Sequence, residues 1–92
     1  MEWKLFADLA EHAGERHVAV DVAPGETVED AIDAPLADRP ALRDRVVAED
    51  GTLRSQINVL RNGSNVFTQQ QGLSTELEAG DELAMFPPVS GG

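Results

Sequence analysis

Apolar and polar side chains alternate along four stretches of the chain, which are residues 3–7, 17–22, 56–61 and 81–86. Because successive side chains of a β-strand point to opposite faces, this period of two predicts four strands. A short helical turn is expected over residues 8–14, and the strands on either side of it should pair as a β-hairpin. The pattern therefore predicts two neighbouring strands at the start of the chain.

Turn dipeptides bound the third predicted strand. Asp50-Gly51 precedes it and Asn62-Gly63 follows it, and both dipeptides favour tight turns. Val66-Phe67 is interpreted as a short edge strand beyond the second turn. The last strand should stop at Pro87, because proline has no amide hydrogen to donate to a neighbouring strand.

The middle of the chain predicts helix. Thr27 and Asp30 match a capping box, in which each side chain accepts a hydrogen bond from the other residue's amide, so a helix should begin directly after Thr27. Pro35 lacks an amide hydrogen and is expected to break or kink this helix near Ala34. A second short helical turn is expected from Pro40.

Helices grouped between runs of strands indicate an α+β fold, in which one main helix packs on a mixed sheet of four to five strands. A chain of 92 residues leaves no room for a second domain, so we expect one domain over residues 1–86. Residues 87–92 should form a flexible tail. Its two successive prolines, Pro87 and Pro88, favour an extended geometry that projects away from the domain.

The charge balance narrows the possible partners. The chain has 17 acidic and 7 basic residues, and its formal net charge is −10 at pH 7, which opposes direct binding to nucleic acid phosphates. Dispersed carboxylates with a single lysine resemble the surface composition of halophilic proteins. No stretch is long and apolar enough to span a bilayer. We therefore expect a cytoplasmic protein, a monomer, that contacts neither nucleic acid nor membrane.

The residue types that usually build active sites are sparse. Cysteine is absent, which excludes disulfides, thiolate nucleophiles and Cys-ligated metals. His12 and His17 have no third ligand at a recognised spacing, and no catalytic triad can be built around them. We expect no catalytic residue, no metal site and no bound cofactor, so the chain is not expected to be an enzyme.

The end of the chain has the most informative chemistry. Gly91 and Gly92 have no side chains, so this backbone can pass through a narrow channel and bring the Gly92 carboxylate to another protein's active site. A carboxylate must be activated, and its attack on the α-phosphate of ATP would give an acyl-adenylate. The adenylated glycine could then accept sulfur as a thiocarboxylate or pass to a lysine amine. In the alternative interpretation, Gly-Gly is only a disordered chain end.

The tail and the strand before it together resemble known protein families more specifically than Gly-Gly does alone. Residues 80–92, GDELAMFPPVSGG, resemble the C-terminus of the small subunit of molybdopterin synthase and of the small archaeal ubiquitin-like modifier proteins. The first strand and the strand before Asn62-Gly63 are similar to the same families, and the acidic, lysine-poor composition resembles a haloarchaeal member. The resemblance implies a β-grasp (ubiquitin-like) fold, an E1-like adenylating enzyme that uses ATP, and Gly92 as the reactive end.

Strand alternation also predicts a partner surface. The side chains expected to face the helix are Trp3, Leu5, Ile57, Val59, Leu83 and Met85. Those expected on the opposite face are Phe6, Leu60, Ala84 and Phe86. In a β-grasp sheet the first, third and last strands adjoin, so these four should form an exposed apolar patch that, with Pro87, Pro88 and Val89, binds the adenylating enzyme. In the alternative, a loop covers Phe6 or Phe86.

Three functions remain open from the sequence. The first is a protein modifier, joined by isopeptide bonds from Gly92 to lysines of target proteins. The second is a sulfur carrier for molybdopterin synthesis, with the large synthase subunit as partner, or for tRNA thiolation. The third is a non-covalent binding module, for which the tail would have no consequence. Lys4 is the only lysine and a candidate acceptor for self-conjugation, and a simple surface charge is the alternative.

Overall fold

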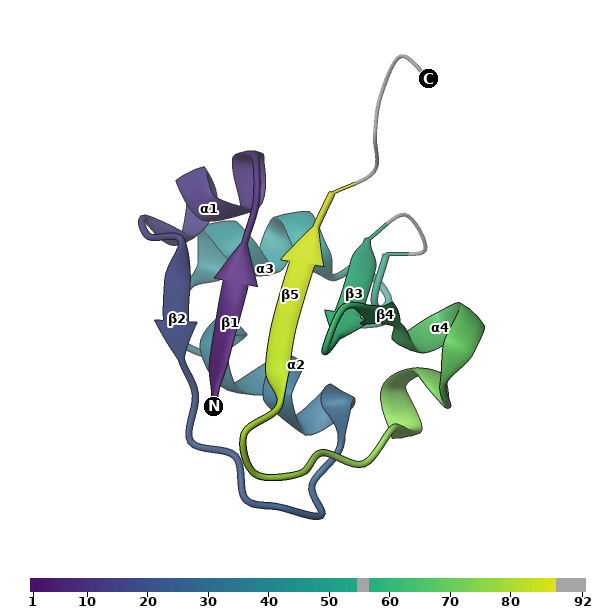
Figure 1. Ribbon diagram of the computed structural model, residues 1–92. Helices are drawn as coiled ribbons and strands as arrows, with labels where there is room; N and C mark the ends of the chain where they lie inside the picture. The colour runs from purple at the N-terminus through teal and green to yellow at the C-terminus, as the bar shows by residue number, and fades with distance from the viewer. Residues whose placement is uncertain (55–56, 88–92) are drawn as a thin grey trace.

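Five strands form one mixed sheet in the order β2-β1-β5-β3-β4 (Figure 1). The computed structural model describes residues 1–54 and 57–87. Its strands are β1 (Glu2–Leu5), β2 (His17–Ala19), β3 (Asn58–Arg61), β4 (Ser64–Asn65) and β5 (Glu82–Phe86). β1 is parallel to β5 and antiparallel to β2, whereas β3 is antiparallel to both β5 and β4. The predicted hairpin and the central pairing of the first and last strands are confirmed.

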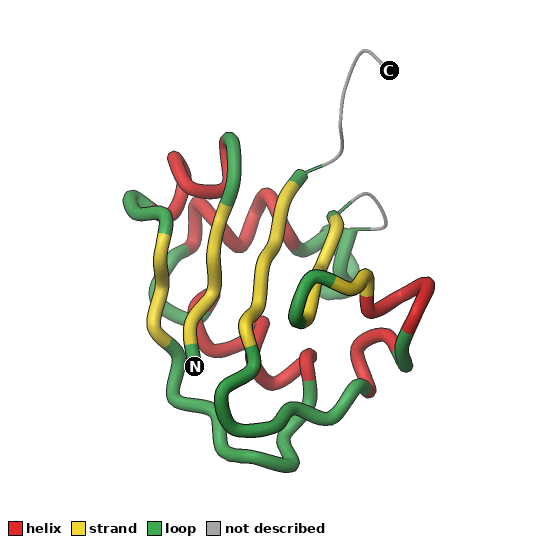
Figure 2. Tube along the Cα trace, viewed as in Figure 1, coloured by secondary structure: helices red, strands yellow, loops and turns green. Residues whose placement is uncertain are grey.

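The helices lie mainly behind this sheet (Figure 2). They are α1 (Asp8–Ala13), α2 (Val28–Leu36), α3 (Pro40–Val46), α4 (Val66–Gln69) and the 3-10 helix η1 (Gly72–Ser74). All six side chains predicted to face the main helix are buried: Trp3, Leu5, Ile57, Val59, Leu83 and Met85. They pack with buried residues of α2 and α3 into one hydrophobic core, whose burial supplies most of the stability of such a small domain.

Local signals in the sequence fix several of these elements. Thr27 N–H donates to the Asp30 carboxylate at 3.0 Å, and Asp30 N–H donates to the Thr27 hydroxyl at 3.4 Å, so the predicted capping box begins α2. Asn62 and Gly63 both have positive φ, as a two-residue type I′ turn requires, and this turn joins β3 to β4. The helical segments expected after the first strand and from Pro40 are also present.

The helix break predicted near Ala34 is wrong. α2 does not break near Ala34 but continues through Pro35 and ends at Leu36. In a helix the amide of residue 35 would donate to the carbonyl of Ala31, four residues earlier, and proline cannot make that bond. The indole Nε1–H of Trp3 donates to the Ala31 oxygen instead, at 2.7 Å. A side chain from β1 thus satisfies the buried carbonyl that proline leaves without its usual donor.

We expect Trp3→Phe to lower the free energy of unfolding by about 1–3 kcal/mol through the unsatisfied Ala31 carbonyl alone. The loss of ring volume adds to this cost. Pro35→Ala supplies a new amide donor to the same carbonyl, so it should recover stability in the Trp3→Phe background and gain less in the wild type. Urea unfolding followed by circular dichroism measures all four proteins, and equal effects of Pro35→Ala in both backgrounds would refute this account.

The edge strand expected at Val66-Phe67 is also wrong. Val66 begins the short helix α4, and the edge strand β4 lies just before it. Asn65 explains the difference, because its side-chain oxygen accepts a hydrogen bond from Phe67 N–H at 2.8 Å and caps the helix. Asparagine is among the preferred N-cap residues.

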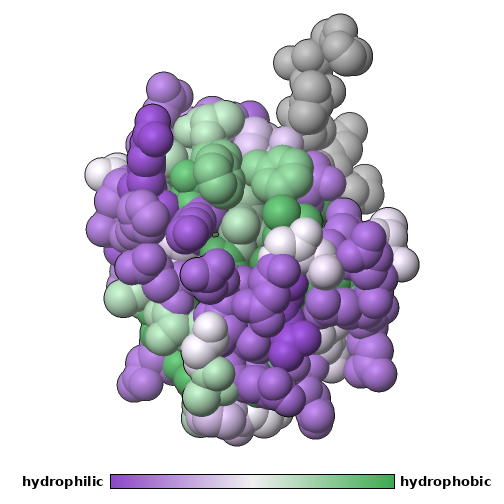
Figure 3. Space-filling view, in the orientation of Figure 1, coloured by the Kyte–Doolittle hydropathy of each residue, from purple (hydrophilic) through white to green (hydrophobic). Residues whose placement is uncertain are grey.

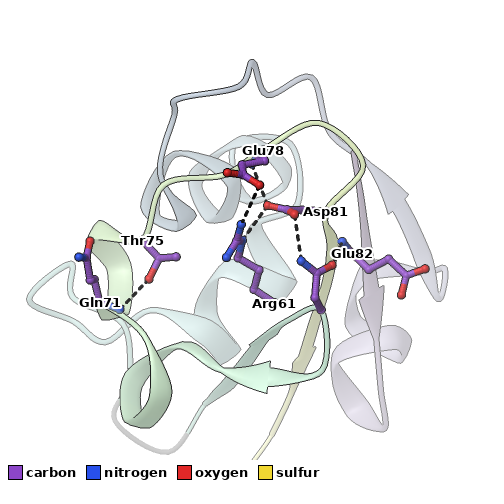
Figure 4. A network of polar contacts seen from close by, with 7 residues as sticks. Arg61, Gln71, Thr75, Glu78, Asp81 and Glu82 are labelled. Carbon is purple, nitrogen blue, oxygen red and sulfur yellow. Dashed lines mark hydrogen bonds and ion pairs between the residues drawn. The ribbon is translucent and has the colours of Figure 1, made fainter.

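A polar network fastens the start of β5 to the β3–β4 turn (Figure 4). The Asp81 carboxylate accepts hydrogen bonds from Arg61 Nε at 2.7 Å, Asn62 Nδ2 at 2.9 Å and Glu78 N–H at 2.8 Å. Its side chain is 7% exposed. Burial alone would raise the pKa of Asp81, but these hydrogen bonds and the Arg61 charge hold the pKa below its usual value.

Asp81→Asn should destabilise the domain at neutral pH by about 1–2 kcal/mol, because the charged acceptor is lost. The folded-state pKa lies below the unfolded one, so ionised Asp81 stabilises the fold above about pH 4, and this contribution is lost as pH falls through the folded pKa. Urea unfolding at neutral and acid pH should show that the difference in unfolding free energy between Asp81→Asn and the wild type becomes smaller in acid. Glu82→Gln is the control, since the exposed Glu82 side chain makes no hydrogen bond with described residues. If Glu82→Gln destabilises the domain as much as Asp81→Asn does, the prediction is contradicted.

Candidate partner surface and tail

The face of the sheet that points away from α2 and α3 brings the predicted apolar residues together. Ala84 of β5 pairs with Lys4 of β1 on one side and with Leu60 of β3 on the other. Phe86 lies two residues further along β5, and Phe6 directly follows β1 at the same end. The structure therefore places all four predicted residues, Phe6, Leu60, Ala84 and Phe86, on one continuous surface, here called the apolar patch.

Phe6 and Phe86 form the outer end of the patch. Their ring centroids are 6.3 Å apart and the ring planes meet at 84°, which is the edge-to-face arrangement that aromatic pairs favour. Phe6 N–H donates to the Met85 carbonyl at 3.3 Å, which continues the β1–β5 pairing and holds the two rings side by side. Phe6 is 49% exposed, so no described loop covers it, and Phe86 is half-buried. Figure 3 shows a cluster of hydrophobic residues on the upper part of this face, with mostly hydrophilic residues around it.

Ala7 directs the chain out of the sheet directly after Phe6. Its φ is 54° and its ψ is −133°, in a region that residues with a side chain rarely adopt. Such a conformation costs about 1–3 kcal/mol, and such costs are found most often where the chain's direction matters for function. Gly14 has a φ of 83° and ends α1, and this left-handed residue returns the chain to β2. These two turns keep Phe6 at the end of β1 with one side open.

The tail begins beside the apolar patch. β5 ends at Phe86, and the half-buried Pro87 follows it at the upper end of the sheet in Figure 1. The remaining residues with a predicted role, Pro88, Val89, Gly91 and Gly92, lie outside the described residues. The structure does fix where the tail begins: Pro87 follows the central strand β5, next to the Phe6–Phe86 pair.

Charged groups border the patch in an arrangement that alternation alone does not reveal. Lys4 is exposed and pairs in register with His17 of β2, and His17 Nδ1 lies 3.0 Å from a Glu2 carboxylate oxygen. Leu5 N–H donates to the Arg16 carbonyl at 2.8 Å, which brings Arg16 alongside β1. The sequence analysis missed Arg16, because only the β1–β2 register places it here. Among the described residues, no group of three or more His, Asp or Glu could hold a metal ion.

Residues 3–92 match the ThiS family. The chain belongs to that family. Small archaeal modifier protein 1 of Haloferax volcanii is 58% identical to it over 92 residues, which is the full length of both proteins. The crystal structure of that modifier has a TM-score of 0.88 against this ThiS-family chain, with 58% identity, and the match covers 100% of this chain and 98% of the other. The predicted family and the β-grasp fold are confirmed.

Two less similar proteins are a putative sulfur carrier and a chain in the structure of a complex. A putative sulfur carrier protein of Archaeoglobus fulgidus is 39% identical over 49 residues, which cover 53% of this ThiS-family chain and 54% of that protein. In the crystal structure of the BexX/CysO complex of Amycolatopsis orientalis, the matching chain is 32% identical with a TM-score of 0.76, over 99% of this chain and 98% of that one. No helix in residues 1–54 and 57–87 is long and apolar enough to cross a membrane.

Proposed function

We propose that this protein is a ubiquitin-like modifier whose Gly92 carboxylate is adenylated by an E1-like enzyme and then joined to lysines of target proteins. The observation that carries the proposal is its 58% identity, over full length, to a small archaeal modifier protein. The exposed Phe6–Phe86 pair beside the start of the tail supports it, because a substrate protein must present its reactive end next to a surface that the enzyme can bind.

The chemistry needs two steps. A Gly92 carboxylate oxygen attacks the α-phosphate of ATP, so that a mixed anhydride forms and pyrophosphate leaves. A lysine amine of the target then attacks the activated carbonyl, so that an isopeptide bond forms, AMP leaves and the amine loses a proton. Because this chain has no cysteine, any thioester between these steps must use a sulfur of the partner. ATP is used by the enzyme in this scheme, which requires no cofactor on this chain.

In this proposal the apolar patch and the tail have separate roles. Phe6, Leu60, Ala84 and Phe86 dock on the adenylating enzyme, and Pro87, Pro88 and Val89 guide the tail into its active site. Aromatic pairs give large contact area at low entropic cost, which suits a docking surface. The proposal includes a cytoplasmic location and a monomeric state for the protein.

A second function, sulfur carrier, uses the same adenylate. Sulfide from a donor would attack the adenylate carbonyl, form a C–S bond, release AMP and lose its proton, which leaves a Gly92 thiocarboxylate. This thiocarboxylate could serve molybdopterin synthesis with the large synthase subunit or serve tRNA thiolation. Membership of the ThiS family and the similarity to a putative sulfur carrier protein favour this function. A single protein can serve both purposes, since the branch point is the nucleophile that attacks the adenylate.

Mass spectrometry of the tagged protein recovered from its native host tests the proposal. Isopeptide remnants of this tail on lysines of other proteins would establish a modifier. A thiocarboxylate at Gly92 without such remnants would make the protein a dedicated sulfur carrier. If neither species is present, both covalent functions are wrong and a non-covalent binding module remains.

Lys4 has the only side-chain amine that could link copies of this protein into chains. It is exposed on β1, and its amine makes no hydrogen bond or ion pair with described residues. If it is the acceptor, Lys4→Arg should abolish side-chain-linked multimers while the fold stays unchanged. Immunoblots of the wild type and the variant, both recovered from the host, measure the multimers. Multimers that persist in Lys4→Arg would contradict this role of Lys4, unless mass spectrometry places the link on the N-terminal amine.

A further inference from the structure

A groove of about 700 Å³ lies between the upper ends of β1 and β2 and the helix α1. Its lining includes the apolar residues Phe6, Ala7 and Ala10 and the cations Lys4 and Arg16. Phe6 belongs both to this groove and to the apolar patch, so the two surfaces are continuous. The hydrophobic residues on the upper part of Figure 3 are bordered by hydrophilic residues.

The cations of this groove are unusual in a chain that has 17 acidic residues and 7 basic ones. Arg39, Arg45 and Arg61 each form an ion pair with a carboxylate, and Arg54 donates to a backbone carbonyl. Among residues 1–54 and 57–87, the basic side chains that make no hydrogen bond or ion pair are Lys4, Arg16 and Arg43. Two of these three lie in the same groove.

The groove is also lined by carboxylates, and most of the acidic groups near it already have a partner. Glu15 already binds Arg39, with 2.8 Å between Arg39 Nη2 and the Glu15 oxygen, and His17 is paired with Glu2. Glu11 is then the only lining carboxylate without a described partner. The groove therefore presents two free cations against one free carboxylate, on a protein whose net charge is −10. Two cations without a described partner, side by side on an acidic protein, favour a negatively charged partner segment.

We propose that this groove binds an acidic segment of the E1-like adenylating enzyme, with its Asp or Glu side chains on Lys4 and Arg16 and an apolar side chain against Phe6 and Ala10. The inference rests on the proposed function and adds a second contact to the apolar patch. Arg16 gives direction as well as charge, because its planar guanidinium can hold a carboxylate by two parallel hydrogen bonds. Lys4 acts here by charge, so Lys4→Arg should preserve the contact.

The test is binding of each variant to the purified adenylating enzyme of the same organism, measured by isothermal titration calorimetry. Arg16→Glu and Lys4→Glu should each weaken binding about tenfold, as expected when a charge-assisted contact becomes a repulsive one. The matched control is Arg43→Glu, which makes the same charge change on α3, away from the groove, and should change binding less than about twofold. Trp3 fluorescence, from a fully buried indole, verifies that each variant is folded.

Equal binding by Arg16→Glu and Arg43→Glu would overturn the groove contact. Loss of binding in Lys4→Arg would also overturn it, because the charge is retained there. Phe86→Glu in the same series separates the two proposals. If Phe86→Glu weakens binding and Arg16→Glu does not, the docking patch stands and only the groove fails; if the wild type does not bind the enzyme at all, the proposed function itself is wrong.

Discussion

Deletion of Gly92 is expected to abolish adenylation, conjugation and thiocarboxylate formation together. The shortened tail ends about 3.3–3.6 Å earlier, the length of one extended residue. Misplacement of a reacting group by about 1 Å can already cost about 100-fold in rate, so we expect a loss of at least that size. Pyrophosphate release by the purified activating enzyme with ATP measures the first step directly.

The same variant contains its own control. The apolar patch is unchanged in the Gly92 deletion, so the variant should still bind the enzyme and inhibit activation of the wild type as a competitor. A deletion variant that is adenylated at the normal rate would show that the reactive carboxylate does not depend on residue 92. A variant that neither reacts nor binds would show that the tail, and not the patch, supplies most of the affinity.

Phe6→Glu and Phe86→Glu should each reduce kcat/KM for adenylation by about 30-fold or more while leaving the domain folded. Replacement of an aromatic anchor at the centre of an interface commonly costs about 2 kcal/mol or more, and about 2 kcal/mol corresponds to about 30-fold. The effect should be in KM more than in kcat, because the patch binds the protein and does not touch the reacting atoms. Initial rates at increasing concentrations of the variant separate the two constants.

Phe67→Glu is the matched control for these substitutions. Phe67 is 44% exposed, close to the 49% of Phe6, and it lies on α4, which follows β4 at the opposite side of the sheet from β1 and Phe6 (Figure 1). The same change of side chain and charge there should leave activation within about twofold of wild type. If Phe67→Glu reduces activation as much as Phe6→Glu, then added negative charge and not the loss of a specific contact is responsible.

Most of the fold follows from local patterns in the sequence. Period-two alternation identified four strands and their buried faces, and Thr27 with Asp30 identified the start of α2, because these signals depend on neighbouring residues. The two errors have different causes. Pro35 is tolerated because Trp3, 28 residues before Ala31, supplies the missing donor, and no local pattern contains that contact. At Val66-Phe67, by contrast, the Asn65 cap was visible in the sequence, and β-propensity was given more weight than capping.

The candidate surface was predictable only in part. Alternation placed Phe6, Leu60, Ala84 and Phe86 on one face, and family resemblance supplied the pairing of first and last strands that makes them adjoin. The positions of Lys4 and Arg16 around one groove depend on the register of β1 against β2 and on the turn at Ala7. The positive φ of this turn could not be predicted from the sequence, because alanine rarely adopts it. The roles of Gly91 and Gly92 remain predictions from chemistry and resemblance.

The parallel pairing of β1 with β5 also has a mechanical consequence. The start of β1 and the exit of β5 lie at opposite ends of the sheet, so a pull between the N-terminus and a target attached to the tail would slide the two strands along each other. In that geometry the hydrogen bonds between the strands share the load and must fail together, whereas strands that are peeled apart lose their bonds one after another. If the tail is joined to a target, as proposed, a pull through that bond would load all of these hydrogen bonds at once, and opening the domain would take more force than peeling the strands apart.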